Sequence, residues 1–115
     1  MQSKYDQLKR ARNFNTDQNG NVFSDFTKLQ VWNKAQIVPG VEPAYRRKDA
    51  CGAWIDWDQF NVTNENGTGW EIDHIKPVAM GGDDVIANLQ PLQWQNNRKK
   101  GNDYPALDFI VVNST

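Results

Sequence analysis

Four polar side chains in the second half of the chain have the types and spacing that metal-assisted hydrolysis uses. Asp73 directly precedes His74, which is the one histidine among 115 residues. Asn88 and Asn97 follow at intervals of 14 and 9 positions. Carboxylate and amide oxygens are hard ligands, and Mg²⁺ takes only one or two of them from protein because water and substrate complete its coordination shell. Histidine changes charge near neutral pH, so it is suited to take a proton from water.

Hydrolysis of a phosphodiester is one reaction that such a set of groups can support. A divalent cation neutralises charge on the phosphate and on the leaving oxygen. In this scheme Asp73 and Asn97 are the candidate metal ligands and His74 is the candidate general base. The spacing alone leaves ordinary alternatives open, because a lone histidine is usually a surface or core residue. Asn97 could be simply an exposed helix residue, although asparagine is a mediocre helix former.

The first element that must position these residues is a strand over residues 70–75, where apolar and acidic residues alternate. Pro77 ends it, because proline has no amide hydrogen to donate. Neighbours on a regular strand point to opposite faces, so Asp73 and His74 can share one site only if the backbone turns there. Glu71 lies on the same face as Asp73, either beside the site or as a solvated carboxylate.

The elements after that strand are short. Gly81-Gly82 opens a loop, and the acidic pair that follows could cap a helical turn through residue 87. Residues 88–92 are typical of a second strand. Residues 93–100 are predicted to form a helix that ends at Gly101. This order requires the helix to fold back if Asn97 is to reach Asp73.

The first 69 residues are predicted to supply supporting elements. Helical spacing of apolar residues is found over residues 4–12 and 26–37, and Pro39-Gly40 ends the second helix. Residues 46–60 are predicted to be extended, with a hairpin around Cys51-Gly52. Together these patterns indicate one small α+β domain over residues 1–115.

The spaced motif of the second half resembles that of the HNH endonuclease family, which has the ββα-metal fold. The elements that agree in order are Trp-Glu-Ile-Asp-His-Ile-Lys-Pro, Gly-Gly, Asn-Leu-Gln-Pro-Leu and Asn-Asn-Arg-Lys-Lys-Gly-Asn. They cover residues 70–102, which would form the ββα-metal core of the domain, with residues 1–69 as a supporting region.

The resemblance implies a role for each of the four residues. His74 would be the general base, Asn88 would orient the loop that carries it, and Asp73 with Asn97 would hold one divalent metal, Mg²⁺ or Mn²⁺. The family's third name-giving position is Asn97 here, where other members carry histidine. The implied reaction is hydrolysis of phosphodiester bonds in DNA, with RNA as an alternative substrate.

One feature departs from many members of that family, which hold a structural zinc with two Cys-x-x-Cys pairs. The positions just before the final helix are Gln93 and Asn96, and Cys51 is the one cysteine of the chain. A structural zinc is therefore not expected. We expect packing to hold the fold instead, with the tryptophans as the main candidates: Trp32, Trp54, Trp57, Trp70 and Trp94.

The charge balance by itself does not indicate nucleic-acid binding. Lys plus Arg number 13 and Asp plus Glu number 14, but a balanced sum can hide a basic face. Arg98 and Lys100 on the final predicted helix are the best candidates for phosphate contacts, and Arg47 is a weaker one. Each could equally be a solvated charge.

The remaining expectations concern location and partners. No apolar run is as long as a membrane span, the N-terminus lacks the pattern of a secretory signal, and cysteine is scarce, so we expect a cytoplasmic protein without a membrane partner. A single site cuts one strand per engagement, so a homodimer or larger assembly is compatible with double-strand cleavage. Two rival interpretations stay open: a non-catalytic nucleic-acid-binding module, and the nuclease part of a toxin or larger assembly.

Overall fold

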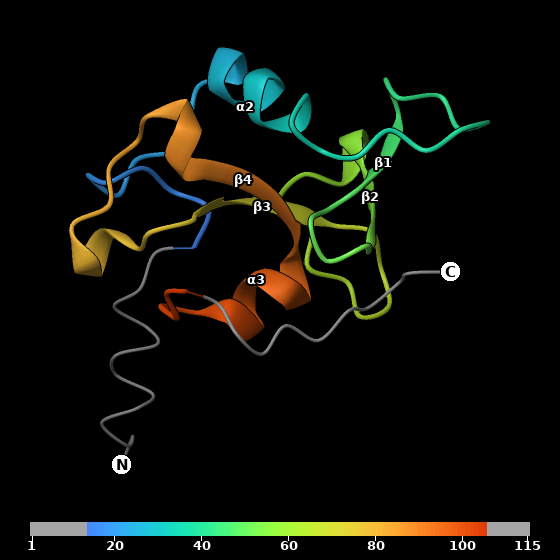
Figure 1. Ribbon diagram of the computed structural model, residues 1–115. Coiled ribbons are helices and arrows are strands. Elements are labelled where there is room, and N and C mark those ends of the chain that lie inside the picture. The colour runs from blue at the N-terminus through green and yellow to red at the C-terminus, as the bar shows by residue number, and fades with distance from the viewer. Residues whose placement is uncertain (1–13, 106–115) are drawn as a thin grey trace.

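The computed structural model describes residues 14–105 (Figure 1). The predicted helix over residues 4–12 lies outside this range. Within residues 14–105, two α-helices and two small antiparallel sheets make up the main regular structure, which confirms the predicted α+β class. The elements are α2 (Asp25–Trp32), β1 (Arg46–Lys48), β2 (Trp54–Asp56), β3 (Trp70–His74), β4 (Leu89–Gln93) and α3 (Trp94–Lys100), with 3₁₀ turns at Trp57–Gln59, Val78–Met80 and Ile86–Asn88.

The predicted order of strand, strand and helix is found in β3, β4 and α3. β3 and β4 pair antiparallel, with Trp70 opposite Gln93 at one end and His74 opposite Leu89 at the other. Pro91 is accommodated in β4 because the two-stranded sheet leaves an edge where no amide hydrogen is needed. α3 begins directly after β4, and the Gln93 side chain caps its first amides. Figure 1 shows α2 on one face of this sheet and α3 on the other.

Helix α2 is shorter than the sequence predicts. Ser24 caps its start, and it ends at Trp32 instead of continuing to residue 37. The chain leaves the helix because later residues are held by other partners: Gln36 pairs with Lys48 of β1. Lys34 donates its ammonium hydrogens to the Ile86 and Leu89 carbonyls. Tertiary contacts have overridden the helical spacing that continues past residue 33.

The predicted hairpin around Cys51-Gly52 is present. β1 and β2 pair antiparallel, with Arg47 opposite Ile55. Gly52 has a φ of +85°, a left-handed conformation that favours glycine in this turn. The extended segment ends at residue 56, because the chain turns into the 3₁₀ segment Trp57–Gln59 and does not continue to residue 60.

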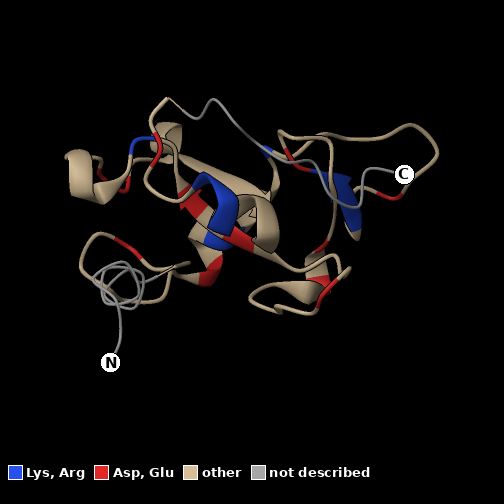
Figure 2. Cartoon of the chain, turned by 90° about the horizontal axis from the view of Figure 1, so that it is seen from below, with Lys and Arg blue, Asp and Glu red and all other residues tan. Residues whose placement is uncertain are grey.

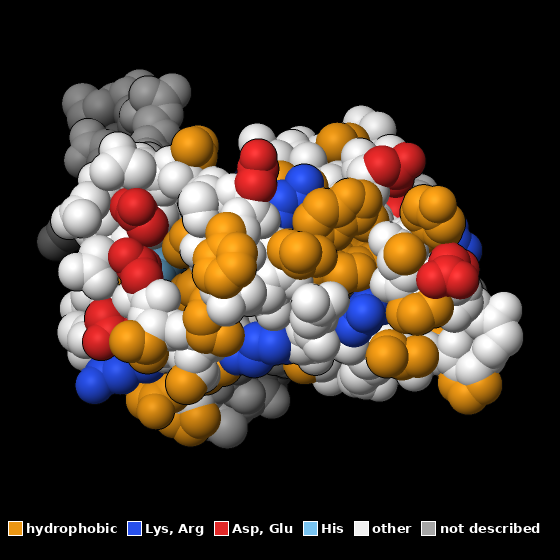
Figure 3. Space-filling model, turned by 90° about the horizontal axis from the view of Figure 1, so that it is seen from above, with side chains coloured by type: hydrophobic (Ala, Val, Ile, Leu, Met, Phe, Trp, Pro, Cys, Tyr) orange, Lys and Arg blue, Asp and Glu red, His pale blue; other side chains and the backbone are white. Residues whose placement is uncertain are grey.

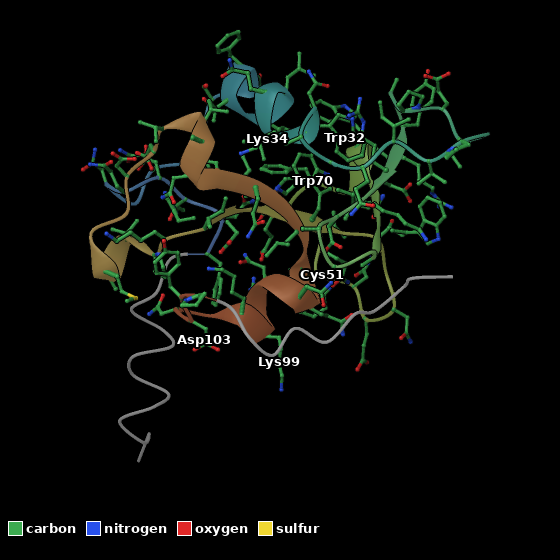
Figure 4. The ribbon with its side chains drawn as sticks, viewed as in Figure 1. Trp32, Lys34, Cys51, Trp70, Lys99 and Asp103 are labelled. Carbon is green, nitrogen blue, oxygen red and sulfur yellow. The ribbon has the colours of Figure 1, made fainter. Side chains whose placement is uncertain are left out.

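An aromatic cluster fills the space between α2 and the β3–β4 sheet. Trp32 and Trp70 are buried, with ring centroids 5.1 Å apart (Figure 4). Trp57 and Phe60 pack on Trp70 at 5.9 Å and 4.7 Å. Ile72 lies in the same core. Three of the five tryptophans therefore stabilise the core as expected, whereas Trp54 and Trp94 lie outside this cluster.

A buried polar network joins the β1–β2 hairpin to the start of α3. Asp49 is fully buried, and its Oδ1 accepts hydrogen bonds from the amides of Cys51 and Ala53 at 2.9 and 2.8 Å. Its Oδ2 accepts from the Gln93 amide at 2.9 Å and from Asn96 Nδ2 at 3.1 Å. The expectation that packing alone holds the fold is therefore incomplete, because a buried carboxylate also ties these segments together.

The surface above α2 carries apolar side chains. Phe26 and Leu29 are 70% and 48% exposed, whereas Trp32 is buried. The helical spacing of these apolar residues predicted that all three would lie on one face of the helix. Hydrophobic side chains are visible across this face in Figure 3. Within residues 14–105, no helix is both long and apolar enough to cross a membrane.

Candidate active site

A pocket of about 370 Å³ brings three of the four predicted residues together. Asp73 and His74 enter it from the end of β3, and Asn97 enters it from α3. The fourth, Asn88, does not line it. The rest of the wall comes mainly from a segment before α2 and from the loop after β3, with one further residue of β3 and one residue after α3. These lining residues are Phe14, Asn15, Thr16, Asp17, Gln18, Gly20, Ile72, Pro77, Val78, Ala79 and Asn102.

Asp73 and His74 reach one pocket without a turn in the backbone between them. Strand pairing continues through His74, and the Ile75 amide still donates to the Asn88 carbonyl. The pocket lies along the edge of β3 that β4 does not cover, where Asn15 Oδ1 accepts from the Ile72 amide at 2.7 Å. Side chains from both faces of the strand can border a space at its edge. The expected departure from strand geometry is therefore wrong, and the position of the pocket explains why.

Asp73 is buried and held by two side chains. Lys100 Nζ lies 3.3 Å from its carboxylate, and Gln90 Nε2, directly across the sheet, donates to Oδ2 at 2.9 Å. Lys100 is itself buried and also donates to the His74 carbonyl at 3.0 Å. Asp73 also lines the pocket, and a carboxylate oxygen is a hard ligand of the kind that Mg²⁺ prefers.

Asn97 is oriented by a buried carboxylate. Its Nδ2 donates to Glu71 Oε1 at 2.9 Å, and Arg98 binds both oxygens of Glu71, with Nη2 at 2.8 Å from Oε2. Glu71 is fully buried, so the solvated alternative for this residue is wrong. Because Nδ2 is engaged, the Oδ1 of Asn97 is left buried, without a hydrogen-bond partner among residues 14–105.

The side-chain oxygens of Asp73 and Asn97 fit a hard divalent metal that prefers oxygen ligands. A buried amide oxygen without a partner costs free energy unless a ligand satisfies it, and Asn97 borders the same pocket as the Asp73 carboxylate. Among the described residues there is no cluster of three or more His, Cys, Asp or Glu side chains that would hold a metal. A metal here would use two protein oxygens, as Mg²⁺ commonly does.

His74 has one ring nitrogen occupied by a carboxylate. Its Nε2 lies 2.7 Å from Asp84 Oδ1, and the side chain is 11% exposed. The ring also contacts Phe23, with centroids 5.9 Å apart. Nδ1 forms no hydrogen bond with any residue in the described range. It is the ring atom left to accept a proton.

Asn88 fastens the loop that follows His74. Its Oδ1 accepts from the Lys76 amide at 2.8 Å, and its Nδ2 donates to the carbonyls of Lys76 and Asp83 at 3.1 and 2.9 Å. The loop passes so close to itself that a Cβ at Gly82 would lie 1.8 Å from the Lys76 carbonyl oxygen. Asn88 and Gly82 together fix the path between β3 and the residues around Asp84.

The residues predicted to contact phosphate are used differently by the fold. The basic residues of α3 lie over acidic residues of β3 (Figure 2), with Arg98 on Glu71 and Lys100 on Asp73. Arg47 is buried, and its guanidinium donates to backbone carbonyls that include Pro43 O at 2.9 Å. Arg47 therefore ties the end of α2 to β1, which runs against its predicted role in nucleic-acid binding.

Asp84 is the main residue of the site that sequence reasoning missed. It follows a glycine pair and precedes another short turn, so its local pattern predicted only a helix cap. In the structure it caps no helix, since the turn at Ile86–Asn88 has no side-chain cap. Gln90 was missed for a similar reason: its contact with Asp73 follows from the strand register, which the sequence did not specify.

Comparison with known proteins agrees with this geometry. Residues 53–106 match a family model described as HNH endonuclease. The matched segment contains β3, β4 and α3, and with them all four of the predicted residues. Over this segment the chain is therefore similar to the HNH endonuclease family, and this similarity points to a nuclease-type function. No curated protein matches the chain significantly, and no solved structure does so either.

Proposed function

We propose that this protein is a metal-dependent endonuclease that hydrolyses phosphodiester bonds in DNA. The observation that carries the proposal is the convergence of Asp73, His74 and Asn97 on one pocket. Asn97 Oδ1 is also buried and has no hydrogen-bond partner within residues 14–105. The family match supplies the class of substrate. RNA is the alternative nucleic acid.

Each side chain has a distinct task in the proposed reaction. His74 takes a proton from a water molecule at Nδ1, because Nε2 is engaged by Asp84. Asp73 and Asn97 would hold the divalent metal, which supplies charge neutralisation at the phosphate and at the leaving 3′ oxygen. Glu71 keeps the Asn97 amide turned so that Oδ1 is the atom available. Asn88 keeps the loop after His74 in place.

Lys100 balances the negative charge of Asp73, one of the two proposed metal ligands. Its ammonium lies 3.3 Å from Asp73 and is almost inaccessible to solvent. A buried carboxylate without a cation is costly, so Lys100 compensates the charge of Asp73 and helps to hold it in position.

Cleavage of plasmid DNA in Mg²⁺ or Mn²⁺ tests the proposal, with His74→Ala as the main variant. We expect wild type to nick or linearise the plasmid, EDTA to abolish this, and the variant to lose about 10²- to 10⁴-fold in rate. Asn97→Ala should lose cleavage and weaken metal binding in calorimetry without DNA. Lys99→Ala is the matched control, because Lys99 is exposed on the same helix.

Two outcomes would overturn the proposal. If wild type leaves plasmid and RNA intact with each metal, and His74→Ala binds DNA as well as wild type, the protein is a binding module that shares the HNH arrangement. If wild type and His74→Ala cut equally fast, the nuclease assignment can stand, but His74 is not its base.

A further inference from the structure

Asp84 is a carboxylate in direct contact with the proposed base, on a segment that the motif positions do not include. Its Oδ1 lies 2.7 Å from His74 Nε2. A carboxylate only accepts hydrogen bonds, so the hydrogen in this contact belongs to the ring. A neutral imidazole carries one N–H, and when that hydrogen is on Nε2 the other nitrogen, Nδ1, has a free lone pair.

We propose that Asp84 is a positioning residue for catalysis, which fixes the His74 ring with its hydrogen on Nε2 and its Nδ1 lone pair available to a water in the pocket. This inference rests on the proposed role of His74 as general base. A base must point at the proton it removes, and a ring that is free to rotate or to exchange its hydrogen between the two nitrogens meets that condition only part of the time.

The Asp84 carboxylate is itself held from a second side. The Gln18 amide donates to both of its oxygens, at 3.0 and 3.2 Å. Gln18 belongs to the segment before α2 that forms one wall of the pocket. Asp84 therefore connects that wall to the histidine, and its side chain is 32% exposed, whereas the His74 side chain is 11% exposed.

The backbone on the other side of Asp84 is also restrained. Asn88 Nδ2 donates to the Asp83 carbonyl at 2.9 Å while its Oδ1 accepts from the Lys76 amide. The same asparagine thus holds the loop that leaves His74 and the residue before Asp84. Asn88 therefore helps to fix the backbone on both sides of the contact between His74 and Asp84.

The neighbouring carboxylate provides a matched control. Asp83 is exposed, and its Oδ1 accepts from the Val85 amide at 3.2 Å. Asp83→Asn makes the same change of charge one residue away, and asparagine retains the oxygen that accepts this hydrogen bond. Asp83→Asn is therefore expected to leave both the His74 ring and the rate of cleavage unchanged.

Nuclear magnetic resonance on the metal-free protein tests the geometry directly, because the chain has one histidine. With ¹⁵N-labelled histidine at a pH where the ring is neutral, we expect Nε2 to be the protonated nitrogen. Its hydrogen should give a downfield signal that exchanges slowly with water. In Asp84→Ala the signal should be lost to exchange, and the ring nitrogens should report a mixture of tautomers. Asp83→Asn should resemble wild type, and circular dichroism should show that each variant is folded.

Cleavage kinetics supply the second measurement. We expect Asp84→Ala to lower kcat about 10- to 100-fold with little change in KM, since part of the contribution of the base is lost while the substrate contacts stay. Asp84→Glu, which can restore an acceptor, should recover part of the loss. Asp83→Asn should cut at the wild-type rate.

The two measurements separate failure of this inference from failure of the nuclease proposal. If wild-type His74 carries its hydrogen on Nδ1, or if Asp84→Ala keeps the Nε2–H signal or the wild-type kcat, Asp84 does not position the ring. If the Nε2–H signal behaves as expected but wild type cuts no nucleic acid, the nuclease proposal fails, and the catalytic role of Asp84 fails with it.

Discussion

Replacing Asp49 by alanine should strongly destabilise the fold, although Asp49 lies outside the pocket. Its carboxylate is fully buried and accepts four hydrogen bonds. Three donors are backbone amides, which cannot turn towards water without moving the hairpin or the start of α3. A buried donor left without a partner costs about 1–3 kcal/mol.

The expected loss follows from the number of these donors. Four donors at the lower end of that range give about 4 kcal/mol, against a total stability of about 5–15 kcal/mol for a domain of this kind. With a urea m-value of about 1.5 kcal/mol/M, the unfolding midpoint should fall by about 2.7 M. Asp49→Asn keeps the shape but turns one acceptor into a donor that faces two other donors, so it should lose about 2 kcal/mol.

Urea unfolding followed by tryptophan fluorescence is the direct assay, because Trp32 and Trp70 are buried in the core. Asp58→Asn is the control: Asp58 is an exposed carboxylate, and its replacement should change the free energy of unfolding by less than about 0.5 kcal/mol. If Asp49→Ala is too unstable to purify, Asp49→Asn keeps the test open. A midpoint for Asp49→Asn equal to that of Asp58→Asn would refute the view that this carboxylate joins the hairpin to α3.

Two further predictions concern buried ionisable groups. Lys100→Met should lower the free energy of unfolding by about 3 kcal/mol, because it leaves the buried Asp73 without its cation, and millimolar Mg²⁺ should restore part of it. Urea titrations with and without Mg²⁺ check this against Lys99→Met, whose side chain points away from the sheet (Figure 4), and an unchanged midpoint in Lys100→Met would contradict it. Burial, followed by the charges of Asp49 and Asp73, raises the pKa of the Cys51 thiol from 9.0 to about 12. At pH 8 the folded protein should hold about 10³-fold less thiolate than an unperturbed thiol, so iodoacetamide should alkylate Cys51 far more slowly in the native protein than in urea. Equal rates in the two states would contradict the shift. Because the thiol ionises near its ordinary pKa only in the unfolded chain, this group should reduce stability as pH rises above about 9.

Local patterns were sufficient for the elements that depend on neighbouring residues. Alternation predicted β3, helical composition with Gly101 predicted α3, and the turn at Cys51-Gly52 predicted the hairpin. The predicted end of α2 was wrong. Helical spacing of apolar residues continues past Trp32, but the backbone at Gln36 pairs with Lys48 of β1 instead of continuing the helix. Propensity is a weak signal when hydrogen bonds to distant segments compete with the helix.

The chemical types in the pocket were set by the sequence, and their partners were set by the fold. Asp73, His74, Asn88 and Asn97 could be selected from the motif alone. Many of their contacts join positions 10 to 27 residues apart, as in His74 with Asp84 and Asp73 with Lys100. No local pattern encodes such pairs, because they depend on how α3 packs on β3 and on where the loop after β3 returns.

Residue types and spacing were enough to predict a strand, strand and helix arrangement with a motif that resembles that of the HNH endonuclease family. They did not predict that Arg47 supports the fold, that Glu71 is buried against Asn97, or that the pocket lies at the edge of β3. The physical reason is burial. A charged side chain is identified from sequence as polar, but whether it meets solvent, a ligand or a buried partner depends on which surfaces pack together, and that is a property of the whole fold.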